Sequence, residues 1–173
     1  MRAGKTILIV LILLLGGCSE AGLRTATGVY THTNASMDSD EKIAWIKGPT
    51  DKKYFTDHGT SGYADVFLRT LVKDGHDTHQ LYVAFHDEDW VYFNRAYDSN
   101  GNELKFIEIK RQKVTAGITE HFAATLSDDY LESATHKGLE VRFVGKRGER
   151  KVYMRPHYVK GYLKKYRELT ATK

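Results

Sequence analysis

Residues 63–85, YADVFLRTLVKDGHDTHQLYVAF, contain two runs rich in β-branched and aromatic residues, 63–72 and 78–85, on either side of a polar turn. Asp74-Gly75 lies in that turn, and an Asp-Gly pair readily takes the positive φ angles that tight hairpins require. Strand-forming runs that flank such a pair predict an antiparallel hairpin.

Two further hairpins follow the same pattern. Runs 90–97 and 103–110 flank the turn Asp98-Ser99-Asn100-Gly101-Asn102, and runs 139–144 and 150–154 flank Gly145-Lys146-Arg147-Gly148-Glu149. Three hairpins of this kind predict a mainly-β fold, an antiparallel β sandwich or barrel.

Two short helices are expected among the strands, at about 128–137 and about 156–169. Ser127 is a suitable N-cap and Gly138 a suitable stop for the first helix, while Pro156 suits the first turn of the second. The second helix places apolar and aromatic residues on one face at helical spacing. These are Tyr158, Val159, Tyr162, Leu163, Tyr166 and Leu169.

The N-terminal segment has the layout of a secretory signal. Arg2 and Lys5 precede an unbroken apolar run, residues 7–15, which is followed by Gly16 and Gly17. Nine apolar residues are too few to cross a bilayer core, which takes about 20 residues of helix. We therefore expect residues 1–17 to be a signal peptide that is removed.

The sequence Leu15-Gly16-Gly17-Cys18 resembles the lipobox of bacterial lipoproteins. The resemblance implies that the Cys18 thiol carries diacylglycerol, that cleavage precedes Cys18, and that the new amino group takes a fatty acyl chain such as palmitate. Several acyl chains together hold a domain on a membrane stably. Ser19 stands where aspartate would retain an enteric lipoprotein in the inner membrane, which implies the outer membrane, facing the periplasm. The alternative is a free, unmodified Cys18 thiol.

The processed chain is long enough for one domain. Residues 18–27 are expected to form the lipidated cysteine and a short tether, and residues 28–173 a single β-rich domain. Cys18 is the only cysteine of the chain, so an intramolecular disulfide is impossible.

The C-terminal part also resembles uncharacterised exported lipoproteins of proteobacteria. The likeness rests on the run Gly138-Leu139-Glu140-Val141-Arg142-Phe143, on Gly145-Lys146-Arg147-Gly148, and on Pro156-His157-Tyr158-Val159-Lys160-Gly161-Tyr162-Leu163. It implies export and a β-rich architecture, and it implies no reaction.

Charge is distributed unevenly along the processed chain. Residues 137–173 carry 12 basic and 3 acidic side chains, whereas residues 18–136 carry 12 basic and 19 acidic ones. The basic end predicts a contact surface for an anionic envelope polymer, lipid or protein, made of Arg147, Arg150, Lys151, Lys160, Lys164 and Lys165. The alternative is that these cations form a solvated face over a tyrosine-rich core. Export argues against nucleic acid as the partner.

Three histidines, His76, His79 and His86, are candidate ligands for a catalytic zinc ion. The spacing His76-x-x-His79 in a turn does not place both rings on one helical face, as zinc peptidase motifs do. Paired carboxylates among Asp87, Glu88 and Asp89 are a further alternative, for glycoside hydrolysis. Since neither pattern is complete, we expect no cofactor and no catalytic residue. The sequence predicts a non-catalytic binding or assembly module, and the alternative is a small metal-dependent envelope hydrolase.

Overall fold

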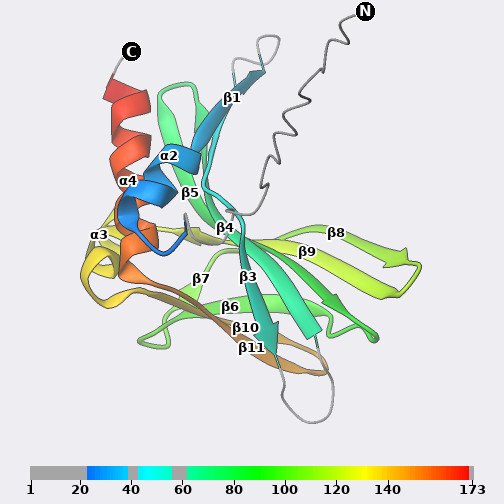
Figure 1. Ribbon diagram of the computed structural model, residues 1–173. Coiled ribbons are helices and arrows are strands. Elements are labelled where there is room, and N and C mark those ends of the chain that lie inside the picture. The colour runs from blue at the N-terminus through cyan, green and yellow to red at the C-terminus, as the bar shows by residue number, and fades with distance from the viewer. Residues whose placement is uncertain (1–22, 39–42, 56–61, 172–173) are drawn as a thin grey trace, which may run out of the picture.

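The computed structural model describes residues 23–38, 43–55 and 62–171 of the chain (Figure 1). Strands account for 57% and helices for 24% of the structure, and the strands form two antiparallel sheets. The prediction of a mainly-β fold with short helices is therefore confirmed.

The larger sheet has seven strands. They are β1 (Asn34–Asp38), β2 (Ile43–Lys47), β3 (Asp51–Phe55), β4 (Gly62–Lys73), β5 (His76–Asp87), β8 (Phe106–Val114) and β9 (Gly117–Leu126). Their order is β1-β2-β4-β5-β9-β8, and β3 also pairs with β4. The strands β2 and β3 follow each other along β4 because Gly48-Pro49-Thr50 interrupts them, and proline has no N–H to donate to a ladder.

The smaller sheet has four strands in the order β11-β10-β6-β7. They are β6 (Phe93–Asp98), β7 (Glu103–Leu104), β10 (Leu139–Gly145) and β11 (Gly148–Met154). The hairpins predicted at 63–85 and 139–154 both form, as β4–β5 and β10–β11. The strand expected at 103–110 is instead divided at Lys105, because Glu103–Leu104 pairs with β6 whereas Phe106–Val114 pairs with β9 in the other sheet.

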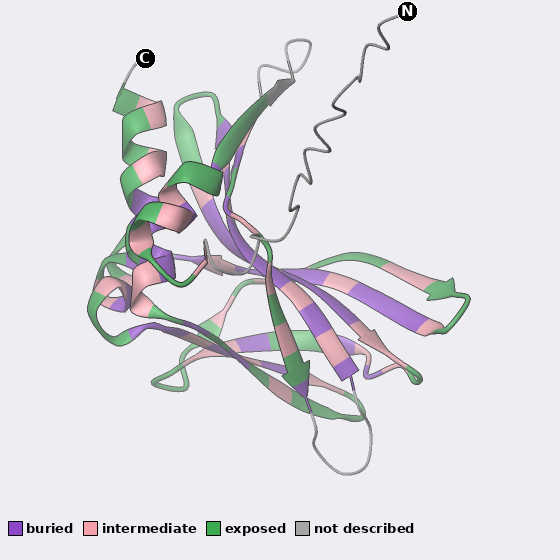
Figure 2. Cartoon of the chain, viewed as in Figure 1, coloured by how far each residue is buried: buried purple, intermediate pink, exposed green. Residues whose placement is uncertain are grey.

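The two sheets pack face to face as a sandwich and share no ladder in the described residues. Aromatic rings from both sheets meet between them. The Phe122 ring centroid lies 4.7 Å from that of Phe93 and 4.9 Å from that of Phe143, and Phe85 lies 5.2 Å from Phe93. Figure 2 shows the buried residues concentrated in this layer and under the helices. Each such ring contributes about 1.5–3 kcal/mol through burial.

The described residues form three helices, α2 (Ala26–His32), α3 (Asp128–Lys137) and α4 (Pro156–Ala171). Helices α3 and α4 confirm the two that were predicted, α4 being two residues longer at its C-terminal end. Helix α2 was not predicted, and the expected start of the domain at residue 28 falls inside it. The folded region thus extends at least to Leu23, whose side chain packs against the core. None of the three helices is long and apolar enough to cross a bilayer.

Candidate functional site

The three histidines considered for a metal site do not share one face of β5. His79 is buried, and its odd spacing from both His76 and His86 places it on the opposite face of the strand. His86 stacks on Tyr63 with 4.4 Å between ring centroids, and its Nδ1 lies 3.0 Å from the hydroxyl of Thr119. Within residues 23–38, 43–55 and 62–171, no three His, Cys, Asp or Glu side chains group closely enough to hold a metal ion.

The six basic residues predicted as a contact surface fall into two separate groups. Arg147, Arg150 and Lys151 belong to the β10–β11 hairpin, whereas Lys160, Lys164 and Lys165 lie on α4. Figure 1 shows α4 and the β10–β11 turn at opposite ends of the molecule. Arg150 is largely covered, with its guanidinium 4.0 Å from Asp87 Oδ2 and 5.6 Å from the Phe85 ring centroid. The predicted lipidation site, Cys18, lies outside the described residues.

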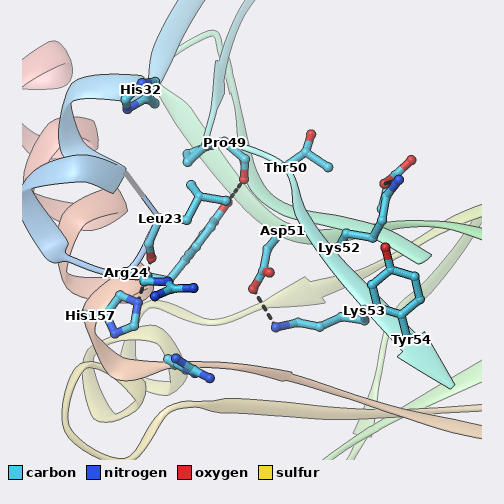
Figure 3. Close-up of a pocket in the computed structure, with 13 residues that line it drawn as sticks. Leu23, Arg24, His32, Pro49, Thr50, Asp51, Lys52, Lys53, Tyr54 and His157 are labelled. Carbon is cyan, nitrogen blue, oxygen red and sulfur yellow. Dashed lines mark hydrogen bonds and ion pairs between the residues drawn. The ribbon is translucent and has the colours of Figure 1, made fainter. Parts of the chain in front are cut away.

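A pocket of about 730 Å³ lies beside β3, between this strand and the N-terminal end of α4 (Figure 3). Its lining comes from three parts of the chain: Leu23, Arg24 and His32; residues 49–54 together with Asp65; and Arg155, His157 and Tyr158. In the described structure β3 pairs only with β4, and Asp65 of β4, the partner of Lys52, also lines the pocket.

The side of the pocket next to β3 depends on a close contact with α4. The Tyr158 hydroxyl donates a 2.5 Å hydrogen bond to the Pro49 carbonyl oxygen, at the interruption between β2 and β3. A Cβ atom on Gly48 would lie only 2.6 Å from that hydroxyl, so glycine is needed for the tyrosine to reach the backbone. Burial raises the pKa of Tyr158 well above its usual value, which keeps the hydroxyl protonated as a donor.

The opposite side of the pocket is held by the packing of α2 on α4. A Cβ atom on Gly161 would lie 2.2 Å from the Ala26 carbonyl oxygen, so only glycine permits this approach of the two helices. The His157 Nε2–H donates a 2.8 Å hydrogen bond to the Leu23 carbonyl oxygen. These contacts fix the chain ahead of α2, and with it Arg24, beside the start of α4 (Figure 3).

The lining of the pocket carries an excess of positive charge. Four cations, Arg24, Lys52, Lys53 and Arg155, face two carboxylates, Asp51 and Asp65, which leaves a formal charge of +2 with neutral histidines. Lys53 Nζ lies 2.5 Å from Asp51 Oδ2, and Lys52 Nζ lies 4.0 Å from Asp65 Oδ1.

Arg24 and Arg155 have no ion-pair partner among the described residues, and both are exposed. Their planar guanidinium groups suit the oxygen atoms of a carboxylate or phosphate. The pocket is therefore chemically fitted to an anion.

A buried hydrogen-bond chain fixes α4 on the larger sheet. The hydroxyl of Thr70 lies 2.5 Å from that of Tyr162 and 2.6 Å from His79 Nδ1, and His79 Nε2 lies 3.0 Å from Asp128 Oδ1. Burial lowers the pKa of His79, although Asp128 and Asp77 oppose the effect, and burial raises the pKa of Tyr162. A neutral His79 that donates to Asp128 accepts from Thr70, so every group in this chain has a partner. His79 is thus part of the α4 anchor.

Sequence reasoning singled out neither Arg24 nor Arg155. They stand 131 positions apart, and neither belongs to a recognisable motif. Comparison with protein-family models, with curated proteins and with solved structures finds no match.

Proposed function

We propose that this protein is a bacterial envelope lipoprotein that acts as a non-catalytic binding module, with the pocket beside β3 as its ligand site. In this proposal Cys18 carries the lipid, and the domain faces the periplasm from the outer membrane. The signal-like segment and the sequence Leu15-Gly16-Gly17-Cys18 support the anchor. The charge of the pocket supports an anionic ligand.

One observation carries the proposed binding function. Arg24 and Arg155, far apart in sequence, line the same pocket, and neither has an ion-pair partner among the described residues. Two unpaired guanidinium groups that line one pocket make its potential more positive, and a bound anion offsets that charge. We propose this pocket in place of the six-residue basic surface expected from the sequence, whose members lie on elements at two ends of the fold.

The ligand class is tested with the full-length lipidated protein in neutral detergent micelles. Inorganic phosphate is the probe, and amide chemical shifts report where it binds. The double variant Arg24→Ala/Arg155→Ala should weaken binding at least about tenfold, since a hydrogen bond to a charged group contributes about 1.5–3 kcal/mol. Lys146→Ala/Arg147→Ala removes the same charge from the exposed β10–β11 turn and should leave the affinity unchanged. Equal affinities in all three proteins would refute an anion site in this pocket.

The anchor is tested separately. Cells that express the protein are fed radioactive palmitate, and their membranes are fractionated. The wild-type chain should be labelled and recovered with the outer membrane, whereas Cys18→Ala should be unlabelled. An unlabelled wild-type protein, with an intact mass that includes residues 1–17, would contradict the anchor without affecting the pocket.

A further inference from the structure

The chain enters the folded domain at the edge of the pocket. Leu23, the first described residue, lines the pocket, and its carbonyl oxygen accepts the hydrogen bond from His157. Arg24, the next residue, carries one of the two unpaired guanidinium groups. The N-terminal end of the described domain, Leu23, therefore lies within one residue of Arg24 at the cationic site.

Chain geometry limits how far the pocket can lie from a lipid on Cys18. Five residue steps separate Cys18 from Leu23, and a fully extended chain spans at most about 3.3–3.6 Å per step, or about 18 Å in all. The polar headgroup layer itself occupies roughly 5–8 Å of that distance. A domain of this size has a radius of gyration of about 15 Å, so the tether is shorter than the domain is wide. With a lipid on Cys18, Leu23 therefore stays within about 18 Å of the acyl anchor.

We propose that the face around Leu23 lies against the membrane and that the pocket binds the phosphate of an anionic phospholipid headgroup in the same bilayer. The inference rests on the proposed function, since it requires both the lipid on Cys18 and an anion in the pocket. Arg24 and Arg155 would bind the phosphate oxygens, and the exposed Lys52 would lie at the rim. The bound headgroup acts as a second membrane contact in addition to the acyl chains.

Because the tether is short, a site with weak affinity for the headgroup is sufficient to keep the domain docked on the membrane. A tethered partner has an effective concentration in the millimolar range, and each cation near an anionic surface favours the docked state about fivefold. Two arginines together therefore favour docking about 25-fold. A docked domain would present the turn between β8 and β9, which lies on the other side of the molecule from α2, away from the membrane (Figure 1).

The single cysteine of the chain makes a clean experiment possible. When Cys18 is lipidated, a cysteine introduced elsewhere is the only free thiol. Thr50→Cys places a fluorophore on an exposed residue of the pocket lining, and Thr115→Cys places it on an exposed residue of the β8–β9 turn. The lipidated full-length proteins are added to vesicles that contain a headgroup-attached nitroxide lipid, which quenches nearby fluorophores.

In vesicles of equimolar phosphatidylcholine and phosphatidylglycerol, we expect much stronger quenching at position 50 than at position 115. The difference should shrink in pure phosphatidylcholine and at high salt, because salt screens charges beyond a few ångströms. It should also shrink in Arg24→Glu/Arg155→Glu, whereas Lys146→Glu/Arg147→Glu, with the same charge change on the β10–β11 turn, should behave as wild type.

Three results would overturn the inference. Equal quenching at positions 50 and 115 would show that the pocket does not face the membrane. A difference in quenching between the two positions that does not depend on lipid charge would show that the tether alone orients the domain. If phosphate binds in micelles but lipid charge has no effect on quenching in vesicles, the pocket binds a soluble anion. The proposed function would then stand, and this inference would fail.

Discussion

Thr70→Val tests whether the buried hydrogen-bond chain fixes α4 in place. Thr70 is completely buried, and its hydroxyl links Tyr162 on α4 to His79 on β5. Valine has nearly the same shape and the same β-branched stiffness, so the substitution removes the hydroxyl without opening a large cavity.

The magnitude follows from the contacts that are lost. Two hydrogen bonds contribute about 0.5–1.5 kcal/mol each, and a buried group left without a partner costs about 1–3 kcal/mol. In the variant the Tyr162 hydroxyl can still donate to the Ile46 carbonyl oxygen, which lies 3.4 Å away. His79 Nδ1 is then the buried group that loses its partner. We expect the free energy of unfolding to fall by about 2–4 kcal/mol. For a domain of this size the melting temperature should drop by roughly 5–15 °C.

The assay is urea unfolding of the full-length protein in detergent, followed by tryptophan fluorescence, with m-values compared to confirm the same transition. Thr125→Val is the matched control, because the Thr125 hydroxyl is also buried in the larger sheet but has no hydrogen-bond partner in the described structure. Its removal should be neutral or slightly stabilising. If the two valine variants unfold at the same urea concentration, the chain through Thr70 does not anchor α4.

Three further expectations can be checked by the same titration. Gly161→Ala should lower stability by about 1–3 kcal/mol, since its Cβ would lie 2.2 Å from the Ala26 carbonyl oxygen; an unchanged midpoint would mean that the helices separate freely. Glu120→Gln should lower the free energy of unfolding by about 2–4 kcal/mol, because this buried carboxylate accepts hydrogen bonds from three backbone N–H groups at 2.7–3.2 Å. A smaller loss would show that the negative charge of Glu120 is not needed for stability. Burial lowers the pKa of His79 and of His121, so the unfolded chain binds protons at a higher pH than the folded chain does, and the free energy of unfolding should fall as pH drops below about 6.5. His79→Gln should make this pH dependence less steep. An equally steep curve would exclude His79 as its cause.

Local features that depend on a few neighbouring residues could be predicted from the sequence. Asp74 and Gly75 take φ angles of 51° and 77°, as the hairpin turn requires. Ser127 caps α3 by accepting the Tyr130 N–H at 3.2 Å, and α4 begins at Pro156. Each of these signals acts over four residues or fewer, so distant parts of the chain cannot override it easily.

Features that depend on tertiary contacts were missed. Helix α2 has seven residues and buries only Val29, so it shows no apolar period. Its position depends on Gly161, more than a hundred residues away. The division at Lys105 was missed for a similar reason, because the run 103–110 reads as one continuous strand. The Thr125 N–H donates to the Lys105 carbonyl oxygen at 2.9 Å, where the chain passes from one sheet to the other.

The tyrosines of α4 explain why the basic C-terminal region does not form one cationic face. Tyr158, Tyr162 and Tyr166 follow at four-residue spacing, and their hydroxyls bind Pro49, Thr70 and Asp77 respectively. Each ring packs inward while its hydroxyl meets a different strand or connection, so α4 can take only one register along the larger sheet.

That register decides which cations stay available. The ammonium groups of Lys164 and Lys165 lie 5.0 Å and 4.9 Å from the Tyr30 ring centroid, and Lys165 also pairs with Glu168. Arg155, one residue before the helix, lines the same pocket as Arg24. The net charge of the region therefore does not locate an anion site. If the proposed pocket binds an anion, the fixed position of α4 determines where Arg155 meets it, and a variant that shifts α4 along the sheet should abolish phosphate binding even with both arginines retained.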